Sequence, residues 1–285
     1  MAVMSITAVG QDAVQKELDR AKAAYQTEKE AYRISVLKEY DKKQDLARKA
    51  GDKKLIDQLK SERDAIEYWG AIPIDVTPAA QIRRAKARTR VEEEFKKAIK
   101  ARLRAKDDAA AAVLEKELLA LRGDDWPHLA LESAKFVGDA IQIGGVEGVY
   151  GISTKEEFSG PVEINAVART DENNIRLYAA RGSAVILNWE GNRNQLRVTR
   201  PDGGDKVESG SIAAARFEPL KKDVWYKLRW RITDEGMQVF VNDKLIFSET
   251  KKYDLTSRSR ISINATDSIV EVRDLHVIPL TNVKQ

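Results

Sequence analysis

Polar side chains that can form hydrogen bonds recur at alternate positions in the second half of the chain. Apolar residues lie between them, so a β-strand would place the polar set on the side opposite a buried core. Amide, guanidinium and carboxylate groups bind sugar hydroxyls and carboxylates, and an aromatic ring can stack on a sugar ring. We therefore predict a ligand-binding face for a glycan or an acidic polymer, with an ordinary solvated sheet face as the alternative. Its residues are Glu163, Asn165, Arg176, Tyr178, Asn188, Arg197 and Arg229.

Composition excludes several kinds of catalytic and metal chemistry. Cysteine is absent, which removes disulfide scaffolds, thiolate metal sites and cysteine nucleophiles. His128 and His276 are too few for a multi-histidine metal centre, and we expect both to be structural or solvent-facing. Oxygen-rich turns at 171–174 and at Asp202 and Asp205 could hold calcium, but polar turns of β proteins share this composition. We predict no metal, no cofactor and no catalytic residue.

The period of two in the apolar residues continues over 135–285, which predicts a β domain. Val162, Ile164 and Ala166 alternate with polar residues, and short turn signals separate many such segments. Asn242-Asp243 is typical of a two-residue hairpin turn. Many short strands with antiparallel turns predict a two-sheet sandwich of the jelly-roll type. The parity of the strands assigns Trp189 and Trp230 to its core.

Specific residues in this region carry a family resemblance. Trp225-Tyr-Lys-Leu-Arg-Trp230, the turn at Gly236, Val239-Phe-Val-Asn242 and Ile246-Phe247 resemble the pattern of concanavalin A-like (laminin-G-like) sandwiches. The segment is also similar to the 3-keto-disaccharide hydrolase family. The resemblance implies a jelly-roll fold in which lectin-like relatives bind ligands on a concave face.

A catalytic pair of carboxylates is incomplete. Laminarinase-like relatives of this fold carry Glu-x-Asp-x-x-Glu on one strand, one acid as nucleophile and one as acid/base. The nearest match is Glu163-Ile-Asn165-Ala-Val-Ala168, where Asn replaces the Asp and Ala replaces the second Glu. The alternative to a binding module is therefore a glycoside-acting hydrolase of the 3-keto-disaccharide type that uses Glu163 or Glu190 without this dyad.

The first part of the chain predicts helices. Only four of the 16 glycines occur in residues 1–123, and apolar residues are spaced by three, four or seven from about Asp12, a plausible N-cap. We predict a helical domain over 11–123, made of two hairpin repeats (11–69 and 79–122), followed by a linker at 124–134. An offset of 55 residues superimposes Val36 on Val91 and Tyr40 on Phe95. The two copies should pack as a bundle or coiled coil, giving a multi-domain α + β protein.

Charge and the amino terminus bear on partners and location. Lys and Arg exceed Asp and Glu by 49 to 45, so nucleic acid is not an expected partner, and the basic residues of 83–90 fit a solvated helix face. No apolar run is long enough to span a membrane. Residues 1–10 resemble a signal-peptide remnant or a disordered terminus, so an extracytoplasmic or secreted location is expected, with the cytoplasm as the alternative.

These observations predict a non-catalytic binding or scaffolding protein. Its β-sandwich would recognise a glycan or protein ligand, and its helices would serve as a spacer or mediate self-association. A purely structural assembly driven by the helices is a further alternative.

Overall fold

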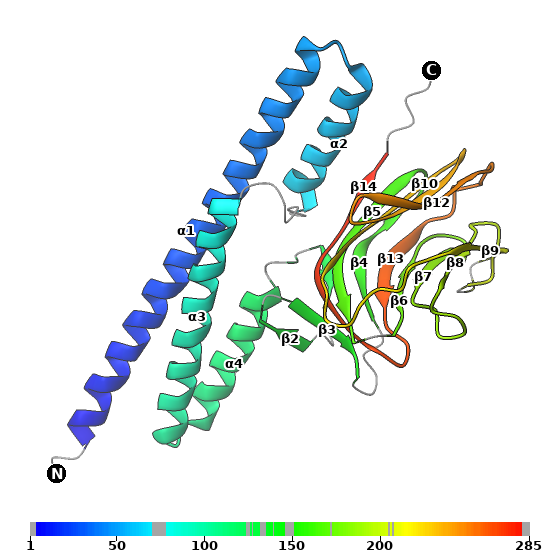
Figure 1. Ribbon diagram of the computed structural model, residues 1–285. Coiled ribbons are helices and arrows are strands. Elements are labelled where there is room, and N and C mark those ends of the chain that lie inside the picture. Colours follow the sequence, from blue (N-terminus) through cyan, green and yellow to red (C-terminus); the bar gives the residue numbers. More distant parts are fainter. Residues whose placement is uncertain are drawn as a thin grey trace. The chain divides into compact units, whose positions relative to one another are not determined.

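Over the residues that the structure describes, four helices precede the strands, as predicted (Figure 1). The computed structural model describes residues 4–69, 78–123, 126, 128–131, 135–138, 140–145, 151–171, 173–204, 206 and 208–280. The helices are α1 (Met4–Lys49), α2 (Lys53–Trp69), α3 (Pro78–Arg104) and α4 (Asp108–Gly123). Helix α1 therefore begins before Asp12, the predicted N-cap. Residues 1–3, part of the expected signal remnant, and most of the linker at 124–134 lie outside the described residues.

The turns of the two helical hairpins are equivalent in detail. Asp52 accepts a hydrogen bond from the amide of Leu55, and Asp107 accepts one from the amide of Ala110, so each aspartate caps the second helix of its hairpin. The residue before each aspartate is left-handed, with φ of 70° at Gly51 and 57° at Lys106. The same backbone hydrogen bonds close both turns at an offset of 55 residues. This agreement supports a duplicated hairpin.

The chain forms two compact units, and they do not separate helices from strands. One unit comprises Met1–Asp45 and Ile74–Trp126, and the other comprises Leu46–Pro73 and Pro127–Gln285. In the first unit α1, α3 and α4 share one apolar core, to which Leu18, Ala21, Tyr25, Val91, Phe95, Ala98, Leu114, Leu118 and Leu121 contribute. Three of the helices thus pack together around one core.

Helix α2 departs from the predicted arrangement. It belongs to the second unit and contacts β14 (Ile269–Pro279) of the sandwich. Its apolar positions Leu59 and Ile66 are nonetheless buried, as are their counterparts Leu114 and Leu121 in α4. The pattern of apolar residues thus fixes which face of each helix is buried but not which partner covers it. The structural units consequently differ from the predicted boundaries at 11–123 and 135–285.

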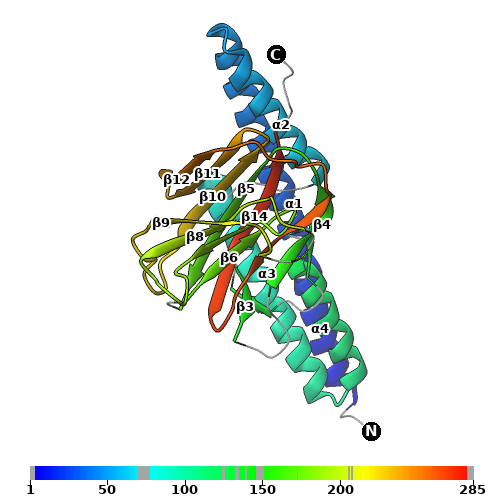
Figure 2. The same cartoon turned by 90° about the vertical axis from the view of Figure 1, so that its right-hand side faces the viewer.

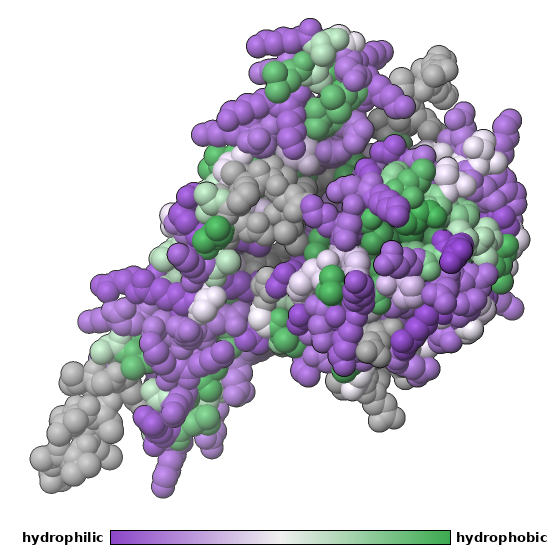
Figure 3. All heavy atoms as spheres, in the orientation of Figure 1, coloured by the Kyte–Doolittle hydropathy of each residue, from purple (hydrophilic) through white to green (hydrophobic). Residues whose placement is uncertain are grey.

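Part of the basic segment of α3 makes contacts within its own unit. Arg83 pairs with Glu28 at 3.3 Å, and the guanidinium of Arg84 lies 4.9 Å from the ring centroid of Tyr32. Arg88 is buried between Glu92 and the ring of Trp126, which corrects the expectation that it lies on a solvated face. On the face seen in Figure 3, the helices carry mainly hydrophilic residues with scattered hydrophobic ones.

The strands form two antiparallel seven-stranded sheets, which confirms the predicted sandwich. The first sheet has the order β1-β4-β13-β6-β7-β8-β9 and the second has the order β12-β11-β10-β5-β14-β3-β2. We call them sheet 1 and sheet 2; Figure 2 shows strands of both. The remaining strands are β1 (Leu129–Ala130), β2 (Lys135–Val137), β3 (Ala140–Gly144), β4 (Gly151–Phe158), β5 (Val162–Thr170), β6 (Ile175–Tyr178), β7 (Ala184–Leu187), β8 (Gln195–Thr199), β9 (Ile212–Arg216), β10 (Tyr226–Thr233), β11 (Gly236–Val241), β12 (Lys244–Thr250) and β13 (Ser259–Asn264).

Alternation along the strands builds the core between the sheets. In sheet 2, Ile164, Leu228 and Trp230 are at most 2% exposed, and in sheet 1 Leu177 and Val198 are equally buried. The polar residues between them therefore face outward, away from the opposite sheet. Each sheet thus has one outer face, and the predicted site residues lie on these two faces.

Candidate functional site

The structure divides the seven predicted site residues between the two sheets. Glu163, Asn165 and Arg229 lie on β5 and β10 of sheet 2. Arg176 and Tyr178 lie on β6, Arg197 lies on β8, and Asn188 follows β7, all in sheet 1. The prediction of one shared face is therefore wrong. Parity along a strand shows which side chains face outward, but it does not show which sheet the strand joins.

On sheet 2, two of the predicted residues, Glu163 and Asn165, form hydrogen bonds within the sheet together with Arg231. Nε and Nη2 of Arg231 donate to Oε2 of Glu163 at 2.9 and 2.7 Å, and Asn165 donates to the other oxygen at 3.4 Å. Glu163 is only 4% exposed. A carboxylate this buried and this well paired holds the sheet together and cannot reach a substrate. Glu163 is thus a structural residue, which removes it as the candidate catalyst.

A buried histidine lies beside this ion pair. His276 is 6% exposed, and its Nδ1 lies 2.9 Å from Asp274 Oδ2, so it is structural rather than solvent-facing. Burial alone would lower the pKa of His276, but Asp274, Glu163 and Glu62 of α2 together raise it above its ordinary value. The influence of Glu62 agrees with the contact between α2 and β14, the strand of His276.

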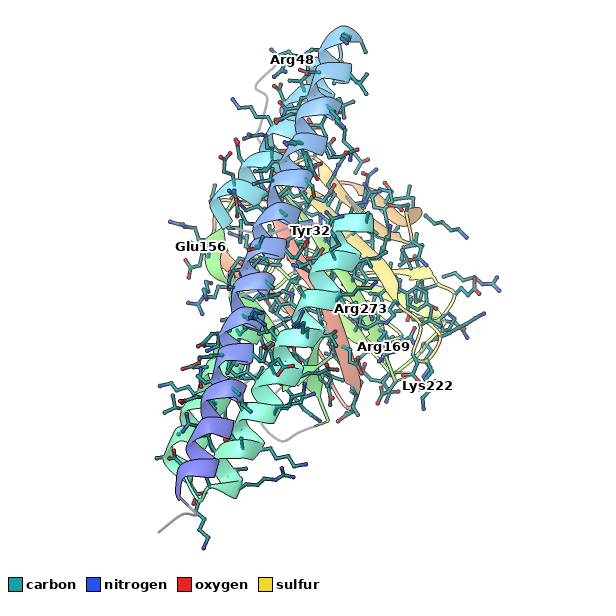
Figure 4. All side chains as sticks on the ribbon, turned by 90° about the vertical axis from the view of Figure 1, so that its left-hand side faces the viewer. Tyr32, Arg48, Glu156, Arg169, Lys222 and Arg273 are labelled. Carbon is teal, nitrogen blue, oxygen red and sulfur yellow. The ribbon has the colours of Figure 1, made fainter. Side chains whose placement is uncertain are left out.

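The arginines on the outer face of sheet 2 also contact carboxylates or aromatic rings, although Nε of Arg229 is buried without an acceptor among the described residues. Arg229 stacks on Phe240, with its guanidinium 4.0 Å from the ring centroid, and lies 3.9 Å from Asp243. Arg169 donates to Glu271 at 3.1 and 2.8 Å. Arg169 and Arg273, labelled in Figure 4, both stack on the ring of Trp225. This face carries many cations, but aromatic rings and carboxylates engage those described here.

On sheet 1 a polar network is centred on Arg176. Its Nη2 donates to Glu190 at 2.5 Å, its Nη1 donates to Glu208 at 2.7 Å, and its Nε donates to Asn174 at 3.1 Å. The Arg176 side chain is 10% exposed and that of Glu208 is 19% exposed, whereas the Glu190 side chain is 48% exposed. Buried groups therefore hold the half-exposed carboxylate of Glu190 in a fixed orientation at the surface.

Tyr178 belongs to the same network. Its hydroxyl donates to Glu208 Oε1 at 2.8 Å. Burial, together with the hydrogen bond to Glu208, raises the pKa of Tyr178 to about 12. The phenol therefore stays protonated at neutral pH and acts as a fixed donor rather than as a base.

Arg197 and Trp189 form the neighbouring part of the face. The Arg197 guanidinium lies 5.0 Å from the ring centroid of Trp189. Trp189 is partly exposed, so its assignment to the core is wrong, whereas Trp230 is fully buried as predicted. The left-handed backbone of Asn188, with φ of 52°, ends the alternation of β7 and turns Trp189 toward the outer face of sheet 1. The ring also fills the space where a side chain at Gly191 would lie.

Asn188 has a structural task. Its side chain donates to the carbonyl of Leu220 at 2.9 Å and accepts from the amide of the same residue at 2.7 Å. The residue is 1% exposed. Both polar atoms of the amide are thereby used, so Asn188 has no free group to offer to a ligand.

Sequence reasoning missed Glu208 and treated Glu190 only as a lone carboxylate. Glu208 lies in the loop between β8 and β9 and has a left-handed backbone, with φ of 54°. Because no strand period extends into this loop, its sequence gives no sign that it reaches Arg176, thirty-two positions earlier. Six residues on the outer face of sheet 1 thus form one group, which we call the sheet 1 site: Arg176, Tyr178, Trp189, Glu190, Arg197 and Glu208.

The side chains proposed for calcium are engaged with protein groups. Asp202 accepts hydrogen bonds from Ser211 and Lys251, and Asn173 bonds the carbonyl of Asp267 and the side chain of Arg193. Glu172 and Asp205 lie outside the described residues. Within the part of the chain that the structure describes, no three His, Asp or Glu side chains are arranged to hold a metal ion.

A small crevice also opens at the end of the sandwich. Phe158, Val162, Ile232, Leu255 and Ile261 contribute to its lining, which contains no charged side chain. It therefore lacks the groups that orient a polar ligand.

Comparison with known proteins gives matches only among solved structures. No family model and no curated protein matches the sequence. The carbohydrate-binding module CBM66 from Bacillus subtilis matches at 11% identity and TM-score 0.39, over 51% of this chain and 91% of that one. The carbohydrate recognition domain of Emp47p matches at 13% identity and TM-score 0.42, over 54% of this chain and 88% of that one. The Ca²⁺/Man3GlcNAc-bound exoplasmic/lumenal domain of VIP36 matches at 11% identity and TM-score 0.44, over 56% of this chain and 86% of that one.

All three TM-scores are below 0.5. The assignment of the sandwich consequently rests on the two sheets described above, and any function must be argued from the sheet 1 site itself. In the helices, over their described residues, no stretch is long and apolar enough to cross a membrane.

Proposed function

We propose that this chain is a non-catalytic saccharide-binding protein and that the sheet 1 site is its binding surface. The observation that carries the proposal is the half-exposed carboxylate of Glu190, which Arg176 and Asn174 hold in place. A fixed carboxylate accepts hydrogen bonds from sugar hydroxyls without losing side-chain freedom on binding. Trp189 beside it is partly exposed and adds an apolar contact for a sugar ring.

The helices have a separate role in this proposal. Helices α1, α3 and α4, which share one core, serve as a spacer to another surface or associate with a second copy. An extracytoplasmic location stays our expectation from residues 1–10.

The binding test uses the full chain and a panel of neutral and acidic oligosaccharides, with affinity measured by titration calorimetry. We expect at least one saccharide to bind and Glu190→Gln to weaken its binding about tenfold, because a charged hydrogen-bond acceptor becomes a neutral amide. Glu235→Gln is the matched control, since Glu235 is an exposed glutamate on the turn between β10 and β11 of sheet 2. Equal affinity of the Glu190→Gln and parent chains, or no binding to any saccharide, would contradict the proposal.

A glycoside-acting hydrolase is the second candidate, because Glu190 and Glu208 converge on one guanidinium. Against it, both carboxylates are occupied by Arg176, whereas an acid/base pair must reach the substrate. Incubation with oxidised (3-keto) disaccharides and detection of free monosaccharides decides between the two. Turnover that disappears in Glu190→Gln would establish the hydrolase, and an absence of products would leave the binding module.

A further inference from the structure

Arg197 differs from Arg176 and Arg200 in having no polar partner among the described residues. Arg176 has three partners, and Arg200 donates to Glu249, Ser211 and the carbonyl of Ile212. Among the described residues, Arg197 makes only the stacking contact with Trp189, and its Nε is buried without an acceptor. A guanidinium has five N–H donors, so this side chain holds unused hydrogen-bonding capacity at a fixed position.

The strands around Arg197 cannot neutralise it. Across the sheet its neighbours are Ile186 on β7 and Ala214 on β9. Along its own strand the next outward-facing residues are Gln195 and Thr199. None of these four side chains carries a negative charge. The carboxylate of Glu190, which follows Trp189, is directed at Arg176 and Asn174.

Arg176 and Arg197 lie two strands apart in the sheet. The register pairs Arg176 with Ile186 and Ile186 with Arg197, so two strand spacings, about 10 Å, lie between their backbones. The carboxylates of Glu190 and Glu208 are paired with the Arg176 guanidinium, which offsets the repulsion that they would exert on an anion at Arg197.

Stacking on Trp189 determines which anion fits. An indole holds the plane of a guanidinium and leaves its edges available for hydrogen bonds. Two parallel N–H groups in one plane match the two oxygens of a carboxylate. A planar carboxylate is therefore the complementary group.

We propose that Arg197 recognises the carboxylate of a uronic acid unit, so that the saccharide bound at the sheet 1 site is acidic. This inference rests on the proposed saccharide-binding function and adds the class of ligand. Glu190 then binds hydroxyl groups of the same saccharide, and the carboxylate at Arg197 fixes its position along the sheet.

The test compares matched ligands on the full chain. Galacturonate, glucuronate and mannuronate trisaccharides are titrated beside the same trisaccharides with their carboxyl groups reduced to alcohols. At least one acid should bind about 10- to 100-fold more tightly than its reduced form, because a charge-assisted pair is lost on reduction. A sulfated neutral trisaccharide should bind more weakly than that acid, since a tetrahedral sulfate does not match the planar fork.

Two variants locate the effect. Arg197→Gln should remove the preference for the acid, whereas Arg258→Gln, which removes an exposed arginine elsewhere, should leave it unchanged. Melting curves confirm that both variants fold. Equal binding of acid and reduced trisaccharides, a preference that survives in Arg197→Gln, or equal binding of the sulfated sugar would overturn the inference. If reduced sugars bind in a Glu190-dependent manner without acid preference, saccharide binding stands and only this inference fails; if nothing binds, both fail.

Discussion

The outer faces of the two sheets carry similar residue types but differ in how these residues are used. On sheet 2, Arg231 and Glu163 saturate each other, and His276 is paired with Asp274. On sheet 1, a buried arginine holds Glu190 half-exposed, and Arg197 has no polar partner among the described residues. The two faces are therefore distinguished by the partners of their side chains and not by residue type.

The largest expected effect is on the sheet 2 ion pair. Arg231→Met should lower the free energy of unfolding by about 3–5 kcal/mol, because Glu163 is left buried and unpaired. Arg229→Met is the matched control on the same strand and face, where an exposed pair contributes at most about 1 kcal/mol. Urea unfolding followed by tryptophan fluorescence measures both. A double variant, Glu163→Leu with Arg231→Met, should recover most of the lost free energy of unfolding. A similar loss in the Arg229→Met and Arg231→Met variants would refute the expected difference between the buried and the exposed pair.

The network on sheet 1 should be the next most sensitive feature. Arg176→Met removes the shared partner of Glu190 and Glu208 and should cost about 2–3 kcal/mol, since hydrogen bonds to charged groups are lost. The same unfolding measurement applies. A loss below about 1 kcal/mol would show that the network is not what orders this face.

The contributions of the two histidines to the free energy of unfolding should depend on pH in opposite directions. The raised pKa of His276 means that its contribution is complete below about 6.5 and is lost as pH rises through the folded-state pKa. Burial lowers the pKa of His128, although its bond to the carbonyl of Leu275 opposes this shift, so its contribution is lost as pH falls from about 6.5 through the lowered pKa.

Unfolding experiments from pH 4 to 9 test this pair. Above pH 6.5, His276→Asn should reduce the fall in the free energy of unfolding with increasing pH. Below pH 6.5, His128→Asn should reduce the loss of this free energy with decreasing pH. Each change in slope should be no more than about 1.4 kcal/mol per pH unit. Identical pH profiles for the parent chain and the His276 variant would contradict the assignment.

The smallest effect is expected at Arg197. Arg197→Gln removes only its stacking on Trp189 and should change stability by about 0.5–1 kcal/mol. Thermal melts measure this change alongside the Arg176 variant. A loss as large as that of Arg176→Met would mean that Arg197 serves stability, and the contrast within sheet 1 would disappear.

Local patterns in the sequence predicted the elements well. The offset of 55 residues identified both hairpins, since Asp52 and Asp107 cap equivalent helices. Alternation identified the buried faces of the strands, including Trp230. It failed at Trp189 because one left-handed residue, Asn188, resets the alternation, and a period cannot reveal such a residue.

Long-range pairing limited the prediction of the site. Arg176, Tyr178 and Arg197 were correctly assigned to one outer face, whereas Glu163 and Arg229 were assigned to it although β5 and β10 belong to sheet 2. Glu208 was absent because an irregular loop brings it to Arg176. Which strand joins which sheet depends on contacts between distant segments, and these leave no periodic trace in a single sequence.

The docking of α2 on β14 has a practical consequence for anyone who divides this chain. A fragment that begins at residue 127 would keep every strand yet lose the helix that contributes Glu62 beside His276. The part of β14 that α2 contacts would become exposed to solvent, and we expect the fragment to be less soluble. Including residues 46–73, or supplying them as a separate peptide, should restore a well-behaved β-sandwich.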